Sequence, residues 1–95
     1  MVERLEDQVE KEERDVEIMR VVLERGPIGI VRLADETGLP EHKVRYSLRM
    51  LESDGLVEPT PDGAIPAEDA TAMLAEQNEE LDRLVERLES MKDIF

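Results

Sequence analysis

Apolar side chains recur at α-helical spacing in the segment before Gly26-Pro27, a pair typical of a helix end. This first stripe consists of Val16, Met19, Val22 and Leu23. The apolar residues between positions 30 and 37 are enough for a second, short helix, which Gly38 closes. They are Ile30, Val31, Leu33 and Ala34. The first part of the chain therefore predicts a long helix that ends near Arg25 and a short helix over residues 30–37.

A third helix is predicted between Pro40 and Gly55. Pro40 stands near a first-turn position, where a missing N–H costs nothing, and Glu41 adds a carboxylate that favours the helix dipole. Gly55 falls where a left-handed residue ends a helix, and a Schellman cap there would place Leu56 against the last apolar turn. The inward face recurs at i, i+4 and i+7 and comprises Val44, Leu48 and Leu51.

The residues after this third helix predict a small β-hairpin. Leu56-Val57-Glu58 forms its first strand, and Thr60-Pro61-Asp62-Gly63 has proline, aspartate and glycine in the order of a hairpin turn. The extended character of residues 26–29 favours a third short strand at Ile28, beside the hairpin. We therefore expect a mainly α-helical fold with very low strand content.

The segment VRLADETGLPEHKVRYSLRMLESDGLVE is similar to the second helix, recognition helix and first wing strand of ArsR/MarR-type transcription regulators, which are prokaryotic and in many cases archaeal. The resemblance extends over residues 15–66, which is 52 of the 95 residues. It implies a winged helix-turn-helix and double-stranded DNA as the partner. The expected organisation is an N-terminal helical extension at 1–14, the winged helix-turn-helix domain at 15–66 and a C-terminal dimerisation helix at 67–95.

The outer face of the third helix predicts contacts to DNA. A 100° step per residue turns it away from the apolar stripe, and Arg45 and Arg49 there are like charges four residues apart. Phosphates or guanine edges would relieve that repulsion, and arginine forks suit both. The candidate DNA-binding residues are Arg32, His42, Lys43, Arg45, Tyr46 and Arg49. In the alternative interpretation these side chains are solvated, and the arginines pair with Glu41, Glu52 or Asp54.

The net charge of −13 opposes nucleic-acid binding unless the acids lie elsewhere. Residues 1–25 hold nine acids and five bases, residues 26–54 five and four, residues 55–66 two and none, and residues 67–95 nine and three. The helix-turn-helix is thus nearly neutral, whereas the wing has no base, so we expect binding to depend on the third helix and Arg32. A net charge of −13 with only three lysines also suits a protein from a salt-rich cytoplasm. Charges are strongly screened there, because the Debye length is about 3 Å at 1 M salt.

Several site classes are excluded by composition. The chain has no cysteine, which rules out disulfides, thiolate metal sites and cysteine nucleophiles, and one histidine, His42, does not build a metal site. P-loop, dinucleotide-binding, H-E-x-x-H and G-x-S-x-G patterns are all absent. We therefore expect neither an enzyme nor a cofactor, and we recognise no small-molecule effector site. No apolar run approaches the roughly 18 residues of a membrane span, and a cytoplasmic protein is expected.

Both ends of the chain carry heptad patterns. Val2, Val9, Val16 and Leu23 repeat every seven residues near the start, with Leu5, Glu12 and Met19 between them. Leu74, Leu81, Leu88 and Phe95 repeat in the same way near the end, with Gln77, Leu84 and Met91 between them. Helices over about 3–25 and 68–91 would each be about 35 Å long, and would project beyond a small core. The predicted homodimer interface comprises Val2, Leu5, Val9, Leu74, Leu81, Leu84, Leu88, Met91 and Phe95. The alternative is a hairpin of these two helices within one chain.

Two functions follow from these patterns. The first is a homodimeric, sequence-specific DNA-binding transcription regulator with the third helix in the major groove. The second is a winged-helix protein–protein interaction module without direct DNA contact, which the acidic wing favours.

Overall fold

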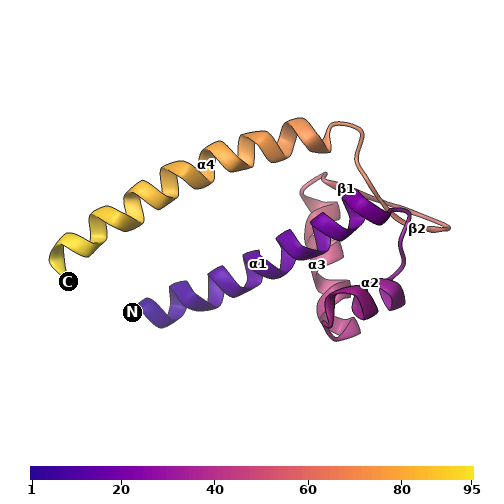
Figure 1. Cartoon of the computed structure of the whole chain (residues 1–95), viewed down its shortest axis with the longest axis horizontal. Coiled ribbons are helices and arrows are strands. Elements are labelled where there is room, and N and C mark those ends of the chain that lie inside the picture. Colours follow the sequence, from indigo (N-terminus) through magenta and orange to yellow (C-terminus); the bar gives the residue numbers. More distant parts are fainter.

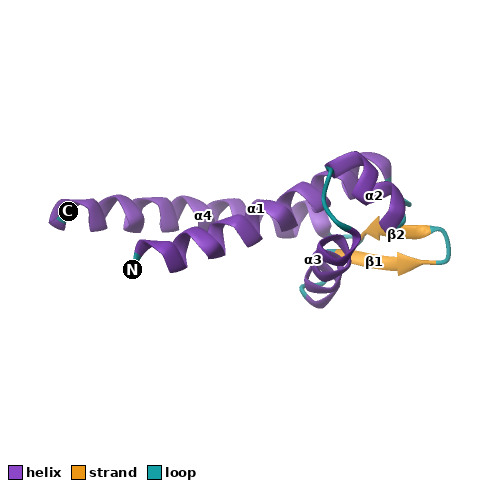
Figure 2. Cartoon of the chain, turned by 90° about the horizontal axis from the view of Figure 1, so that it is seen from below, coloured by secondary structure: helices purple, strands orange, loops and turns teal.

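A computed structural model describes all 95 residues and places them in a folded body with two projecting helices (Figures 1 and 2). The elements are α1 (Val2–Arg25), α2 (Ile30–Thr37), α3 (Glu41–Ser53), β1 (Val57–Thr60), β2 (Gly63–Pro66), α4 (Ala70–Met91) and the 3-10 turn η1 (Lys92–Ile94). The N-terminal half of α1 and most of α4 extend from the body in the same direction, which gives the molecule extents of 51 × 28 × 19 Å. This order and the single antiparallel hairpin confirm the predicted winged helix-turn-helix architecture.

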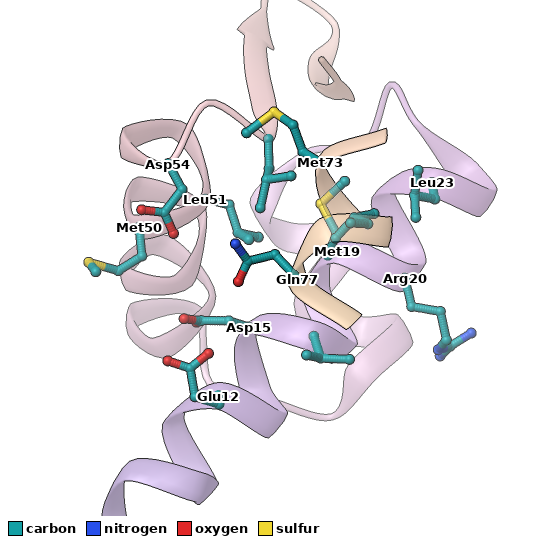
Figure 3. Close-up of a pocket in the computed structure, with 13 residues that line it drawn as sticks. Glu12, Asp15, Met19, Arg20, Leu23, Met50, Leu51, Asp54, Met73 and Gln77 are labelled. Carbon is teal, nitrogen blue, oxygen red and sulfur yellow. The ribbon is translucent and has the colours of Figure 1, made fainter. Parts of the chain in front are cut away.

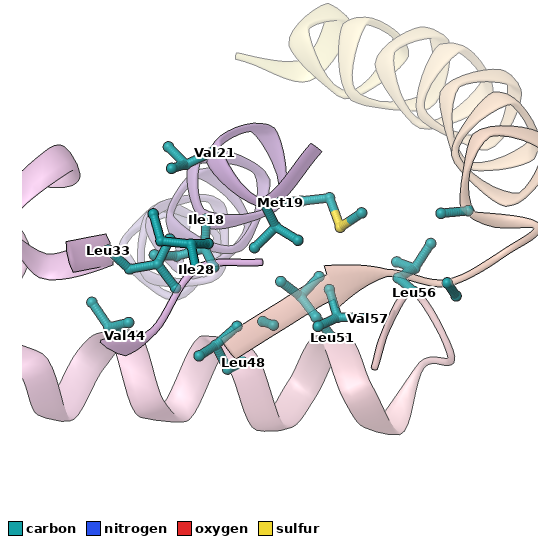
Figure 4. Close-up of a cluster of buried hydrophobic side chains, with 14 residues drawn as sticks. Ile18, Met19, Val21, Ile28, Leu33, Val44, Leu48, Leu51, Leu56 and Val57 are labelled. Carbon is teal, nitrogen blue, oxygen red and sulfur yellow. The ribbon is translucent and has the colours of Figure 1, made fainter. Parts of the chain in front are cut away.

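The hydrophobic core lies where α1, α2 and α3 meet the hairpin, and it contains fourteen buried apolar residues (Figure 4). α1 supplies Ile18, Met19, Val21 and Val22 to it. The helix predicted from Val16, Met19, Val22 and Leu23 is confirmed, but only Met19 and Val22 of that stripe are buried, since Val16 is 66% exposed and Leu23 is also exposed. α1 has two apolar faces: the face with Ile18 and Val21 is buried in the body, whereas on the heptad face only Met19 is buried and Val16 and Leu23 border the open pocket beside α3 and α4.

The inward face of α3 is as predicted, because Val44, Leu48 and Leu51 are all buried. Ser47 lies among them with no exposed surface. The helix ends in a Schellman cap at Gly55, whose φ is 77°. The N–H of Leu56 donates to the Leu51 carbonyl at 2.9 Å, and the N–H of Gly55 donates to the Glu52 carbonyl at 3.0 Å. The predicted helix stop is therefore confirmed.

The hairpin pairs Val57 with Pro66 and Thr60 with Gly63, so its tip is the two residues between Thr60 and Gly63. Ile28 adds the predicted third strand as an isolated antiparallel bridge to Ala64, with N–H···O distances of 3.1 and 2.8 Å. Gly63 has a φ of 126°, and a Cβ there would lie 2.5 Å from the carbonyl carbon of Ile28. The wing is thus joined to the body along its second strand.

Gly26 ends α1 as expected, although it does so for a different reason. Its φ of −63° and ψ of 146° are extended, whereas a glycine cap usually adopts the left-handed conformation. A Cβ at this position would lie 2.7 Å from the carbonyl oxygen of Val22 and 3.0 Å from that of Ala64. Glycine is therefore required by close approach of the backbone rather than by a left-handed turn.

α1 and α4 make almost no contact with each other beyond the base of α4 (Figure 1). Ala70, Met73 and Leu74 pack on the body, and every residue from 75 to 95 is exposed. The alternative of an intramolecular hairpin of the two long helices is therefore not what the structure shows. None of the helices has a stretch long and apolar enough to cross a membrane.

Candidate nucleic-acid interface

The turn between α2 and α3 fixes the angle at which α3 leaves the body. Gly38 has a φ of 74° and its N–H donates to the Ala34 carbonyl at 2.8 Å. The Thr37 hydroxyl donates to the Leu33 carbonyl at 2.6 Å and accepts the N–H of Leu39 at 3.3 Å. Pro40 is the N-cap residue, one position before the first helical turn. Because each residue of this turn is hydrogen-bonded or conformationally fixed, α3 is held firmly against α2.

All six predicted DNA-binding side chains are exposed. Five lie on α3, and Arg32 lies on α2. Arg32, Lys43, Arg45 and Arg49 form no salt bridge and no side-chain hydrogen bond within the chain. The alternative in which the arginines of α3 pair with carboxylates of the same helix is therefore not observed. The cationic groups of this face are free to bind an external anion.

Arg14 of α1 also belongs to this surface, and the sequence reasoning missed it. Its Nε donates to the Ser47 hydroxyl at 3.1 Å, and its guanidinium carbon lies 5.5 Å from the centre of the Tyr46 ring. Both contacts hold a fifth cationic group against α3. The one available signal was Ser47, a polar residue at an inward position of the helix, which predicts a polar partner on whichever element packs there.

The hairpin contributes no positive charge to the interface. Glu58 on β1 and Asp62 at the tip are both exposed, and residues 55–66 include no base. The two-residue tip also limits how far the hairpin can extend beyond α3. That binding depends on the helices therefore stays a prediction.

The surfaces predicted to form a dimer fall into two groups. Leu74 is partly buried and packs against the core of its own chain. The other eight residues are exposed: Val2, Leu5, Val9, Leu81, Leu84, Leu88, Met91 and Phe95. The exposed residues lie on two helices that project together from the body (Figure 1). Nothing within the chain covers these two apolar seams.

A pocket of about 560 Å³ lies at the base of the projecting helices, between α1, α3 and the start of α4. Figure 3 shows Met19 and Leu23 of α1, Met50 of α3 and Met73 of α4 around this apolar space. Carboxylates of α1 and α3 lie at its edge. They are Glu12, Asp15 and Asp54. The pocket therefore touches the side of α3 that adjoins α1.

A comparison with known families agrees with this geometry. A protein-family model described as winged helix-turn-helix DNA-binding matches residues 11–58, which is just over half of the chain. The match includes the C-terminal half of α1, the whole of α2 and α3, and the start of β1, and so it covers Arg14 and every predicted DNA-binding residue. No curated protein matches the chain. On the fold, the free basic face of α3 and this family match, the chain belongs to the winged helix-turn-helix DNA-binding family.

Proposed function

We propose that the chain is a sequence-specific transcription regulator of the ArsR/MarR type that binds DNA as a homodimer, with α3 in the major groove. The observation that carries the proposal is the exposed face of α3, on which no carboxylate neutralises Lys43, Arg45 or Arg49. The major groove is about 12 Å wide and admits one α-helix, and an arginine fork binds the O6 and N7 atoms of guanine.

The basic residues divide into two roles. Arg45 and Arg49 lie one turn apart on the outer face of α3, where a helix in the groove meets base edges, and they are the residues that read sequence. Arg32 on α2 and Lys43 near the start of α3 lie where the DNA backbone would pass, and they bind phosphate. Three further side chains bind phosphate at the edges of this face, and they are Arg14, His42 and Tyr46.

Fluorescence titration with a fragment of the promoter region tests these roles. Arg45→Ala and Arg49→Ala should each weaken specific binding by about 1–3 kcal/mol and relax sequence preference. Lys43→Ala should weaken binding to all sequences alike and make the salt dependence shallower by about one unit of slope. Arg83→Ala, which removes an exposed arginine from α4, is the matched control and should leave the titration unchanged. Absence of binding at every salt concentration would contradict the proposal.

The two exposed seams support the homodimer. Half-sites on DNA are commonly bound by two-fold symmetric dimers, and apolar residues at seven-residue spacing bury themselves between helices of different chains. Sedimentation equilibrium should show a dimer for the intact chain and a monomer for the double variant Leu81→Asp, Leu88→Asp. Ser90→Asp introduces the same charge outside the seam of α4 and should remain dimeric.

Salt gives a second measure of this association. Both long helices carry an excess of acids, so their flanks repel at low ionic strength, and screening should strengthen the dimer as salt is added. A chain that is monomeric at both low and high salt would overturn the homodimer.

A second function is favoured by one observation, the acidic wing. A winged-helix module that binds a basic protein and makes no DNA contact would use Glu58 and Asp62 directly. The double variant Glu58→Lys, Asp62→Lys distinguishes the two functions. It should strengthen DNA binding if the wing lies near phosphates, and it should abolish binding to a basic partner.

A further inference from the structure

The pocket between α1, α3 and α4 is open to solvent and lined mainly by apolar side chains. Its walls include Met19, Leu23, Met50, Met73 and Leu74. Met50 and the C-cap residue Asp54 line it at the C-terminal end of α3, and Figure 3 shows Gln77 of α4 extending toward α3. An occupant of this pocket would therefore contact the projecting helices and the recognition helix together.

The heptad positions of α4 determine which residues of a second copy would face the α4 residues that line this pocket. When two copies of this helix run antiparallel, positions that repeat from Leu74 face positions that repeat from Gln77 in the partner. If Leu81 faces the partner's Leu84, then Gln77 faces the partner's Leu88 and Leu74 faces the partner's Met91. Every layer then contains a large apolar side chain. A parallel pair would instead place two glutamines at position 77 against each other.

We propose that residues 88–95 of a second copy occupy this pocket, in an antiparallel pair of α4 helices. The inference rests on the homodimer of the proposed function and specifies its geometry. The partner's Met91 covers Leu74, and the next turn brings its Phe95 to the base of α4. Phe95 is 76% exposed in the isolated chain, and burial of such a ring removes about 150–250 Å² from water.

One charged side chain of this segment, Lys92, also fits the same placement. The edge of the pocket carries the carboxylates of Glu12, Asp15 and Asp54, and Oδ1 of Asp15 is buried without a hydrogen-bond partner. Residues 88–95 contain two acids, Glu89 and Asp93, and one base, Lys92, which forms no salt bridge in its own chain. In the antiparallel pair Lys92 flanks the seam beside Met91, so it meets this acidic edge.

This antiparallel register also fixes the distance between the starts of the two α4 helices. Its centre lies between Asp82 and Arg83, so the two copies of Ala70 are separated by about 25 residues of helix, or about 38 Å. Neighbouring half-sites one turn apart on DNA are separated by about 34–36 Å. The starts of the two α4 helices, where each joins its folded body, are therefore separated by a distance close to one turn of DNA.

Cysteine cross-linking tests the pairing directly, because the chain has no cysteine of its own. Leu74→Cys and Met91→Cys variants are prepared separately, mixed, allowed to exchange and treated with a short bismaleimide. The mixture should give cross-linked heterodimers, and neither variant alone should give more than traces. Cross-linking of each variant with itself would show a parallel pair and overturn the inference.

A second pair of cysteine variants leaves Leu74 unchanged, because a substitution of this partly buried residue alters the packing of α4 on the body. Gln77→Cys and Leu88→Cys are both fully on the projecting part of α4, and they should cross-link only when mixed. Sedimentation of the same samples separates the two possible failures. Dimers that cross-link in neither mixture overturn the antiparallel register alone, whereas monomers overturn the homodimer as well.

Charge reversal tests the acidic edge. Lys92→Glu should raise the dimer dissociation constant about five- to tenfold, because the symmetric pair contains this contact twice. Lys11→Glu makes the same change at an exposed position outside the heptad seam of α1 and should have less than a twofold effect. Equal effects of the two variants would overturn the placement of Lys92 at the pocket.

Discussion

The folded body and the projecting helices contain the same kinds of side chain but differ in what covers them. In the body, fourteen apolar residues are buried by neighbours from the same chain. In the projecting parts, every residue from 1 to 13 and from 75 to 95 is exposed, although large aliphatic residues recur at regular spacing there too. Apolar periodicity therefore identifies a helix with a partner, but it does not identify whether that partner belongs to the same molecule.

α1 shows both situations within one helix. Val22 has no exposed surface and Val16 is 66% exposed, although the two residues are of the same type and lie six positions apart. Val22 packs among the core residues of the body, whereas Val16 continues the seven-residue seam that runs out along the helix. The difference between the body and the projecting helices can be tested by making the same substitution in each of them.

The largest expected effect distinguishes a body leucine from a seam leucine. Leu33→Ala should lower the free energy of unfolding by about 2–5 kcal/mol at every protein concentration, because Leu33 is wholly buried. Leu81→Ala should act only on the part of the stability that depends on protein concentration, because Leu81 contacts no core of its own chain. Urea denaturation followed by far-UV circular dichroism at two protein concentrations measures both. Equal losses for the two variants would break the distinction.

An intermediate effect is expected where the backbone of the body is itself closely packed. Gly63→Ala should cost about 2 kcal/mol or more, because φ is 126° and the new Cβ would meet the backbone of Ile28. Gly29→Ala is the control, since a Cβ there has no atom within 4 Å, and it should cost less than about 1 kcal/mol. Thermal or urea unfolding of the two variants compares them. A Gly63→Ala variant as stable as the parent chain would show that the wing is not held against Ile28.

The smallest effect compares two serines. Ser47→Ala removes a buried acceptor of the Arg14 side chain and should cost about 1 kcal/mol. Ser90→Ala removes only an exposed bond from the hydroxyl to the Glu86 carbonyl, and it should be neutral or slightly stabilising because alanine is the better helix former. Urea denaturation of both variants, each compared with the parent chain, measures this difference in the free energy of unfolding. A Ser47→Ala variant with the same loss as Ser90→Ala would mean that the tie between α1 and α3 contributes nothing measurable.

Local chemistry was sufficient to predict much of the body. The bounds of α2, the stop of α3 at Gly55, the hairpin and the bridge at Ile28 all follow from capping residues, turn residues and short-range periodicity. The exposed basic face of α3 follows in the same way, since three buried positions fix the orientation of the whole helix. These features are determined by residues close together in the chain.

The errors occurred where distant segments meet. Gly26 approaches Ala64, and Arg14 reaches Ser47 over 33 positions of sequence, so neither contact has a local pattern. In α1 the residues Ile18 and Val21 were missed because the seven-residue repeat is the stronger pattern, and of its members in the body only Met19 is buried. A helix with two apolar faces cannot be oriented from its own periodicity alone.

We expect an inserted residue to have different consequences at Leu56 and at the tip of the hairpin. Its N–H is bound to Leu51 at the end of α3, its carbonyl accepts the N–H of Ala67 at 2.9 Å, and β1 begins at the next residue. One residue inserted here would break these bonds and turn every side chain of β1 to the opposite face of the hairpin. The exposed tip at Pro61-Asp62 is held only by the Thr60 hydroxyl, which donates to the Gly63 carbonyl at 2.6 Å and accepts the N–H of Asp62 at 3.2 Å. Insertions there can extend or recharge the hairpin while α3 keeps its position, so the tip is the site at which this fold can acquire new reach.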